Sequence, residues 1–151
     1  MSGLSLLLLF VGCAGSTGSV PSDAVAAIVD PQRTTHFFDR PFPNDSMLDA
    51  SMHADLTDFP ETPSEVTRSV IAGWADRISQ TSQGFANHGA AYFRFEGPLD
   101  VPEALSGLPT DPVVLIDVET GEQIPLATRF ITHALGDPFL ADNLLCIAPA
   151  L

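Results

Sequence analysis

One stretch decides the fold: residues 90–131, AAYFRFEGPLDVPEALSGLPTDPVVLIDVETGEQIPLATRFI. It is the only long region of the chain in which strand periodicity, turn residues and apolar content agree. Apolar side chains alternate from Ala91 to Phe95, which is typical of a half-buried strand, and Gly97-Pro98 ends it. Val113–Val118 is a nearly continuous apolar run, which predicts a central strand.

A hairpin and a last strand complete the β-rich part. Glu119–Glu122 predicts a hairpin loop, with Gly121 at the position that needs a positive φ. The return strand is predicted over Gln123–Ile131, and Pro125 within it favours an edge position or a bulge, because proline cannot donate to the sheet. Leu144–Ala148 is predicted to be the final strand.

One amphipathic helix is predicted at about residues 63–82. Its start signals are Thr62 as the cap, Pro63 at the first helical position and Glu65 to complete a capping box. Five apolar side chains fall on one side of the helical wheel: Val66, Val70, Ile71, Trp74 and Ile78. We expect this stripe, Trp74 included, to pack into the core.

The segment before the helix predicts an extended, turn-rich chain. Pro41 and Pro43 exclude a helix over His36–Leu48, and Asn44-Asp45 indicates a turn closed by a side-chain hydrogen bond. Three phenylalanines are expected to anchor this segment to the core: Phe37, Phe38 and Phe42.

Composition limits the function. Nineteen acids oppose six basic residues, all arginines, and the net charge of −13 repels nucleic acid, so no nucleic-acid partner is predicted. The acidic loop Asp45–Asp58 fits solvated turn aspartates, with a calcium loop as the alternative although the EF-hand spacing is missing. The four histidines are scattered, so neither a metal site nor a cofactor is predicted. Cys146 is predicted to be a small buried hydrophobe.

The N-terminus is typical of an export signal. Residues 1–12, MSGLSLLLLFVG, contain an apolar run far shorter than the roughly 20 residues of a membrane-spanning helix. Phe10-Val11-Gly12-Cys13 resembles a bacterial lipoprotein signal, so Cys13 is the predicted lipidation site and residues 13–24 a flexible tether. Because no Lys or Arg precedes the apolar run, an ordinary cleaved secretory signal or a buried N-terminal segment remains an alternative.

The rest of the chain resembles the front half of a bacterial Ig-like module. The segments that carry the resemblance are RPFPND (40–45), FRFEGPLD (93–100), PVVLIDVETGEQIPLATRF (112–130) and NLLCIAPAL (143–151). Together they resemble the N-terminal region of exported bacterial lipases of the virulence-factor type, over about residues 30–151. The resemblance implies a partial Ig-like antiparallel β-sandwich, so the expected fold class is mainly β with one amphipathic helix.

The resemblance also implies a domain layout. After the signal (1–12) and the tether (13–24), residues 25–89 form a Pro-rich segment with the helix, and residues 90–151 an incomplete Ig-like β-domain. In the family further strands follow, so the strand at Leu144–Ile147 is expected to keep an unpaired edge, open to a missing C-terminal region or to self-association. The catalytic serine of the lipases has no matching position here, so no catalytic residue is assigned and the substrate-binding residues are unknown.

Two functions are therefore expected. The first is a non-catalytic envelope module, an Ig-like binding or structural domain. It would be exported and held at the outer membrane through Cys13, with secretion as the alternative location. The second is the N-terminal non-catalytic fragment of an exported serine lipase or esterase acting on acyl esters, an interpretation that depends on the resemblance alone.

Overall fold

The computed structural model describes residues 6–7, 24–30, 32, 36–86 and 89–150. Cys13 and most of the predicted signal and tether lie outside these residues. The described elements, in chain order, are β1 (Leu6–Leu7), the 3-10 helices η1 (Phe37–Asp39) and η2 (Asp45–Met47), α1 (Glu65–Thr81), β2 (Ala91–Arg94), β3 (Ala104–Leu105), β4 (Leu115–Asp117), β5 (Gln123–Ile124), β6 (Leu126–Ile131) and β7 (Leu144–Pro149).

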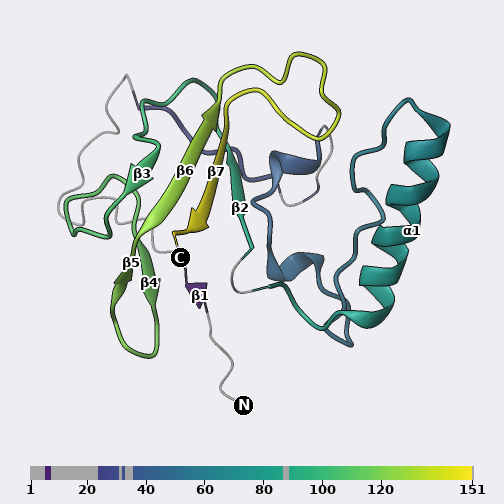
Figure 1. The fold of residues 1–151 in the computed structure, drawn as a ribbon, viewed down its shortest axis with the longest axis horizontal. Helices are drawn as coiled ribbons and strands as arrows, with labels where there is room; N and C mark the ends of the chain where they lie inside the picture. The colour runs from purple at the N-terminus through teal and green to yellow at the C-terminus, as the bar shows by residue number, and fades with distance from the viewer. Residues whose placement is uncertain (1–5, 8–23, 31, 33–35, 87–88, 151) are drawn as a thin grey trace.

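The strands form two antiparallel sheets, shown in Figure 1, that do not close into a sandwich. The larger sheet has the order β2-β7-β6-β3, and the smaller has the order β1-β4-β5. The predicted fold class, mainly β with one helix, is confirmed. The predicted hairpin is also present between β4 and β5, with Gly121 at a φ of 73°.

Pro125 divides the predicted return strand in two. Before it, β5 pairs with β4 in the smaller sheet, and after it, β6 pairs with β7 and β3 in the larger sheet. Pro125 lacks an N–H to donate, but its carbonyl oxygen accepts from the N–H of Ala150 at 2.8 Å. The break at this proline is therefore the point where the chain passes from one sheet to the other.

The prediction of an unpaired edge at Leu144–Ile147 is wrong. β7 lies between β2 and β6, and Leu145 faces Phe93 on one side and Phe130 on the other. Leu144 and Leu145 are the most deeply buried residues of this strand, with 0% and 1% of their surface exposed. The last strand in the sequence folds back into the middle of the sheet, so both of its backbone edges are paired and offer no template for association.

The outer edge of β2 is covered by the N-terminal part of the described chain. Phe42 and Tyr92 exchange two backbone hydrogen bonds of 3.0 and 2.6 Å, and the Ile28 N–H donates to the Arg94 carbonyl at 2.8 Å. This coverage leaves the β2 edge without a free row of donors and acceptors over these residues.

The predicted phenylalanine anchors are confirmed. Phe37 and Phe38 are buried next to Met47, Ala141 and Leu144, and Phe42 packs against the same cluster. The predicted turn is present as well, because the Asn44 side chain accepts from the N–H of Ser46 at 2.8 Å and caps η2. The predicted absence of a helix over His36–Leu48 holds for an α-helix only, because the single-turn helices η1 and η2 lie on either side of the two prolines. The Pro-rich segment is therefore an integral part of the aromatic core.

The helix forms within two residues of its predicted bounds, but the predicted start signals and the predicted burial are wrong. Pro63 precedes the cap, and Glu65 is the first helical residue and not the third residue of a capping box. Ser64, and not Thr62, is the N-cap: its hydroxyl accepts from the N–H of Thr67 at 3.5 Å, while the Thr62 hydroxyl accepts from the N–H of Ser64. More importantly, α1 has no buried residue, and Trp74 is 66% exposed. In Figure 1, α1 lies beyond η1 and η2, at the far side of the molecule from β3 and the β4–β5 hairpin.

Candidate functional site

An apolar groove lies between α1 and the aromatic core. Its volume is about 380 Å³, within the range of ligand-binding clefts. We call it the apolar groove, and its lining residues are Phe42, Leu56, Phe59, Ile71, Trp74, Ala75, Ile78 and Phe139.

The helix presents only part of its apolar arc to this groove. Ile71 and Ala75 are half-buried and face the body of the protein. Trp74 and Ile78 also line the groove but are 66% and 42% exposed, and Val66 and Val70, outside it, are 76% and 47% exposed. These four residues, spaced every four positions, form a continuous ridge that we call the exposed stripe.

The opposite wall of the groove is a set of aromatic rings held by the core. Phe59 meets the buried Phe37 edge-on, with 5.2 Å between ring centroids, and Phe42 meets Phe85 edge-on at 5.5 Å. Phe139 lies 6.2 Å from Phe59. Edge-to-face contacts of this kind fix ring orientation, so this wall is preformed for an apolar partner.

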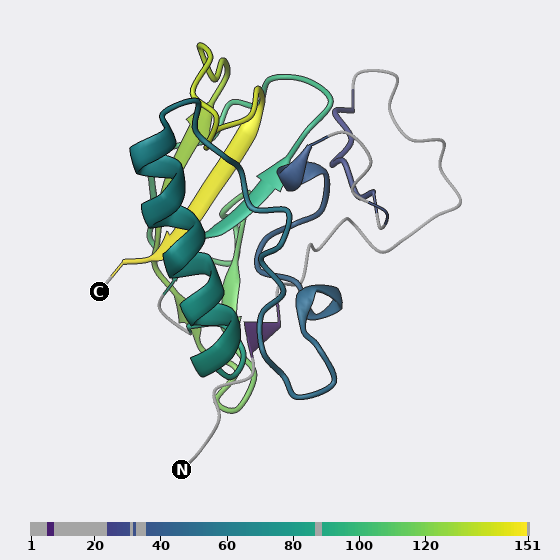
Figure 2. The same ribbon diagram turned by 90° about the vertical axis from the view of Figure 1, so that its right-hand side faces the viewer.

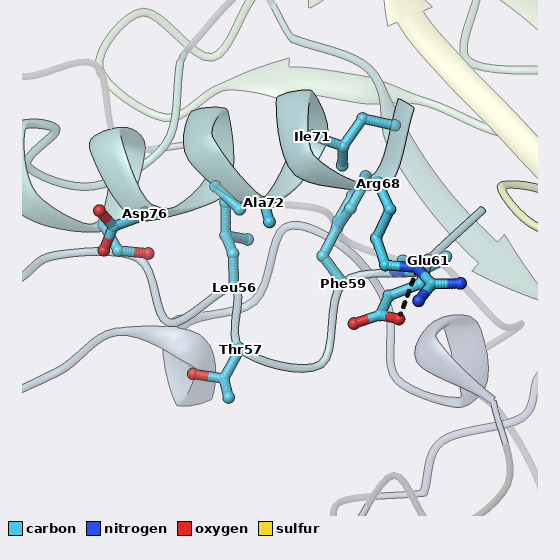
Figure 3. Close-up of a pocket in the computed structure, with 11 residues that line it drawn as sticks. Leu56, Thr57, Phe59, Glu61, Arg68, Ile71, Ala72 and Asp76 are labelled. Carbon is cyan, nitrogen blue, oxygen red and sulfur yellow. Dashed lines mark ion pairs between the residues drawn. The ribbon is translucent and has the colours of Figure 1, made fainter. Parts of the chain in front are cut away.

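A polar cavity of about 250 Å³ adjoins the groove and shares Leu56, Phe59, Ile71 and Ala75 with it. Figure 3 shows this cavity beneath α1, with Glu61 beside Arg68 and Asp76 further along the helix. A Glu61 carboxylate oxygen lies 3.4 Å from Arg68 Nε, and an Asp76 carboxylate oxygen accepts from the amide of Gln80 at 2.9 Å. The hollow beneath α1 therefore has an apolar half and a polar half.

The part of the chain that supplies most of both cavities is acidic in sequence. Between Asp45 and Thr81 the chain carries seven acidic residues and two arginines, which is a net charge of −5. Five of the acids belong to residues 45–61, a segment without Lys or Arg that supplies Leu56 and Phe59 to the groove. The part of the chain that supplies most of the groove lining is therefore acidic overall, although the lining itself is apolar.

A second polar feature is the cluster of His36, Asp39 and Arg94, at the junction of η1 and β2. Arg94 Nη1 pairs with Asp39 Oδ1, and Asp39 Oδ2 accepts from the N–H of His36 at 2.8 Å. Asp39 is only 4% exposed. The His36 Nδ1 atom accepts from the N–H of Phe38 at 3.2 Å, which leaves the proton of the neutral ring on Nε2.

Burial, assisted by the nearby positive charge of Arg94, lowers the pKa of His36 below its ordinary value of 6.5. A histidine with a lowered pKa beside a buried aspartate resembles an acid–base pair. Here, however, both Asp39 oxygens and the His36 Nδ1 atom are engaged in holding the backbone and Arg94. The geometry therefore identifies this cluster as a structural contact that holds η1 against β2.

The predicted site residues are not brought together. Cys13 lies outside the described residues, and Cys146 is half-buried in β7, where burial raises the pKa of its thiol. In the acidic loop, the carboxylates of Asp49 and Asp55 accept from backbone N–H groups of the loop itself. Within the described ranges, no three His, Cys, Asp or Glu side chains are grouped as metal ligands would be.

None of the described helices has the length and apolar content to span a bilayer. Comparison with known proteins gives no further assignment: no family model, no characterised protein and no solved structure matches the chain significantly.

The groove was missed by sequence reasoning although its helical residues were singled out. The apolar stripe was interpreted as a core face, because most amphipathic helices bury such a face. One signal points the other way: the 45–61 segment that has to cover the helix carries as many acids as large apolar residues, five of each. That segment fills only part of the helix face, and the rest stays exposed.

Proposed function

We propose that this chain is a non-catalytic, lipid-anchored module of the bacterial cell envelope that binds a partner through the apolar groove and the exposed stripe of α1. The exposed stripe carries the binding part of the proposal. Four large apolar side chains in one row, next to a preformed aromatic wall, are typical of an interaction surface, because solvated apolar patches of this extent are rare without one.

The anchoring part is supported by the sequence of residues 1–13. Lipidation of Cys13 would hold the module on a membrane durably, because each buried methylene of an acyl chain contributes about 0.8 kcal/mol. Residues 13–24 would then act as a flexible tether, so that the groove faces its partner away from the bilayer.

The groove is tested with Nile red, a neutral dye that emits strongly only in apolar surroundings. We expect a saturable increase in emission with the wild-type protein and a loss of most of it in Ile78→Ser, since Ile78 lines the groove. Val118→Ser is the matched control, because Val118 is 40% exposed, close to the 42% of Ile78, but lies in the β4–β5 hairpin. Equal emission from all three proteins, or none from the wild type, would reject the groove as a binding site.

The anchor is tested in cells with a radioactive fatty acid. We expect the wild-type chain to be labelled and to sediment with membranes, and Cys13→Ala to lose both properties. Ile78→Ser should keep both, because the groove has no part in lipidation. Unchanged labelling and sedimentation of Cys13→Ala would disprove the anchor while leaving the Nile red result intact.

A further inference from the structure

The partner can be described more closely. We infer that the apolar groove receives an amphipathic helix of another protein, with an apolar face flanked by Lys or Arg. This inference rests on the proposed binding function, and it follows from the length of the exposed stripe, the shape of the groove and the charge around it.

The length of the stripe favours a helix over a small molecule. From Val66 to Ile78 the stripe spans three turns, which is about 18 Å at 1.5 Å per residue. A small apolar ligand would cover the groove and leave Val66 and Val70 in water. A partner helix of about the same length can cover the whole row, which is the helix-in-groove mode of recognition.

The shape of the surface supports the same occupant. The exposed stripe is a ridge of residues four apart, and ridges of this kind pack into the grooves of a neighbouring helix. Trp74 belongs to this ridge and also lines the apolar groove, together with Phe139 from the aromatic wall. Side chains of the partner can be received between them. Trp74 combines large area with high exposure, the properties of a residue that dominates an interface.

The negative charge of this chain indicates which charged residues flank the apolar face of the partner helix. Residues 45–81, which supply six of the eight side chains that line the groove, have a net charge of −5, and the chain as a whole has −13. Complementary charge favours encounter and suppresses unsuitable partners, so cationic flanks are favoured and anionic ones are excluded. The same argument disfavours a second copy of this chain, which would bring equal negative charge to the contact.

Trp74 supplies the measurement, because it is the single tryptophan of the chain. Two amidated helical peptides of about 14 residues, long enough for the stripe, share the same leucine row and carry either Lys or Glu elsewhere. We expect the Lys peptide to shift Trp74 emission to shorter wavelength, and to bind at least about tenfold more tightly than the Glu peptide. Added salt should reduce this difference, because the flanking charges are exposed.

Val70→Ser and Val118→Ser are the matched variants, with native side chains exposed by 47% and 40%. We expect Val70→Ser to weaken binding of the Lys peptide at least fivefold and Val118→Ser to leave its affinity unchanged.

Equal binding of both peptides, or equal binding of the Lys peptide by both variants, overturns the inference. If Nile red binds at the groove but neither peptide does, the partner chemistry is wrong while the proposed function stands. A concentration-dependent dimer in light scattering that Val70→Ser abolishes would replace the partner helix with a second copy.

Discussion

Arg94 joins three parts of the chain that are far apart in the sequence. Its Nη1 atom pairs with Asp39 in η1, and its Nε atom donates to the carbonyl oxygen of Asp142 at 3.4 Å. The Asp142 carboxylate in turn accepts from the N–H of Ala134 at 2.7 Å, which orders the loop between β6 and β7. One guanidinium therefore fixes η1 and this loop to the edge of β2.

Removing this guanidinium should destabilise the protein. In Arg94→Met the aliphatic stem is largely kept, but the Asp39 carboxylate, 4% exposed, loses its cation. We expect the free energy of unfolding to fall by about 2–3 kcal/mol, somewhat less than for a fully buried pair, because the Arg94 side chain is itself 25% exposed. Urea denaturation measures the change.

The double variant separates the charge pair from packing. Asp39→Asn keeps an acceptor for the His36 N–H but removes the negative charge. If the pair acts as described, Asp39→Asn/Arg94→Met loses clearly less stability than the two single variants together. Strict additivity of the single effects would show that the two side chains do not interact.

His36 makes this junction sensitive to acid. Its pKa is lowered mainly by burial and next by Arg94, so the unfolded chain takes up a proton at His36 more readily than the folded chain does. Stability therefore rises with pH through the window below 6.5, the ordinary histidine value, and is lost as the pH falls through it.

His36→Asn tests this dependence, since asparagine can still cap η1 but does not titrate. The difference in unfolding free energy between wild type and variant should be constant above a pH of 6.5 and shift against the wild type below it. Parallel curves across the whole range would mean that His36 does not contribute to the acid sensitivity.

At the scale of elements, α1 differs from the strands in how it is held. Leu126 in β6 and Leu144 in β7 are at most 1% exposed, while α1 contains no buried residue. In α1, Ile71 and Ala75 are half-buried, Ser64 caps the N-terminus and Arg68 forms an ion pair with Glu61. Exposed ion pairs contribute little, so the helix depends on a narrow apolar contact.

Trp74→Ala distinguishes an exposed stripe from a core face. Burial in a core would predict a loss of about 3–5 kcal/mol on truncation to alanine. Because Trp74 is 66% exposed, we expect a loss of less than about 1 kcal/mol in urea denaturation. Leu126→Ala is the control and should lose about 3 kcal/mol, since Leu126 is 1% exposed. A large effect at Trp74 would place the stripe in the core after all.

At the scale of the whole molecule, we expect the free energy of local opening to be lower for α1 than for the four-stranded sheet. Figure 2 shows α1 along one side of the molecule, and its contact with the rest passes through the 45–61 segment and the aromatic wall. Regions with few buried apolar contacts open at a lower free energy than the core does. The helix can therefore loosen while the four-stranded sheet stays intact.

Hydrogen exchange measures this division. We expect the amides of α1 to exchange at least about tenfold faster than those of β6 and β7, a difference of about 1.4 kcal/mol in opening free energy. Addition of the Lys peptide should slow exchange in α1 and leave the central strands unchanged. Equal protection of the backbone amides of α1 and of the sheet would contradict this difference in opening free energy.

The lipase interpretation also belongs to this scale, because it concerns what accompanies the chain. It stays a prediction that depends on the resemblance of residues 30–151. The DNA downstream of codon 151 tests it: a continuing frame that encodes a Gly-x-Ser-x-Gly elbow would support an enzyme.

The sequence by itself determined the single helix, the strand β2 and the hairpin turn, but not η1, η2 or β3. Alternation placed β2, apolar spacing placed α1 to within two residues, and Gly121 placed the hairpin turn, whereas Pro125 signalled an irregularity but not that the return strand is two strands in different sheets. These features depend on neighbours a few positions away in the chain, so a single sequence contains the information.

Only the tertiary structure decided which apolar faces are covered. β7 lies in the centre of its sheet because β2 and β6 both pair with it, and residue spacing within the strand does not encode those partners. The exposed stripe of α1 has the same periodicity as a buried one, and its exposure depends on how much of the helix the 45–61 segment can cover. Burial is a property of contacts between distant segments, which is why the groove appears only in the folded chain.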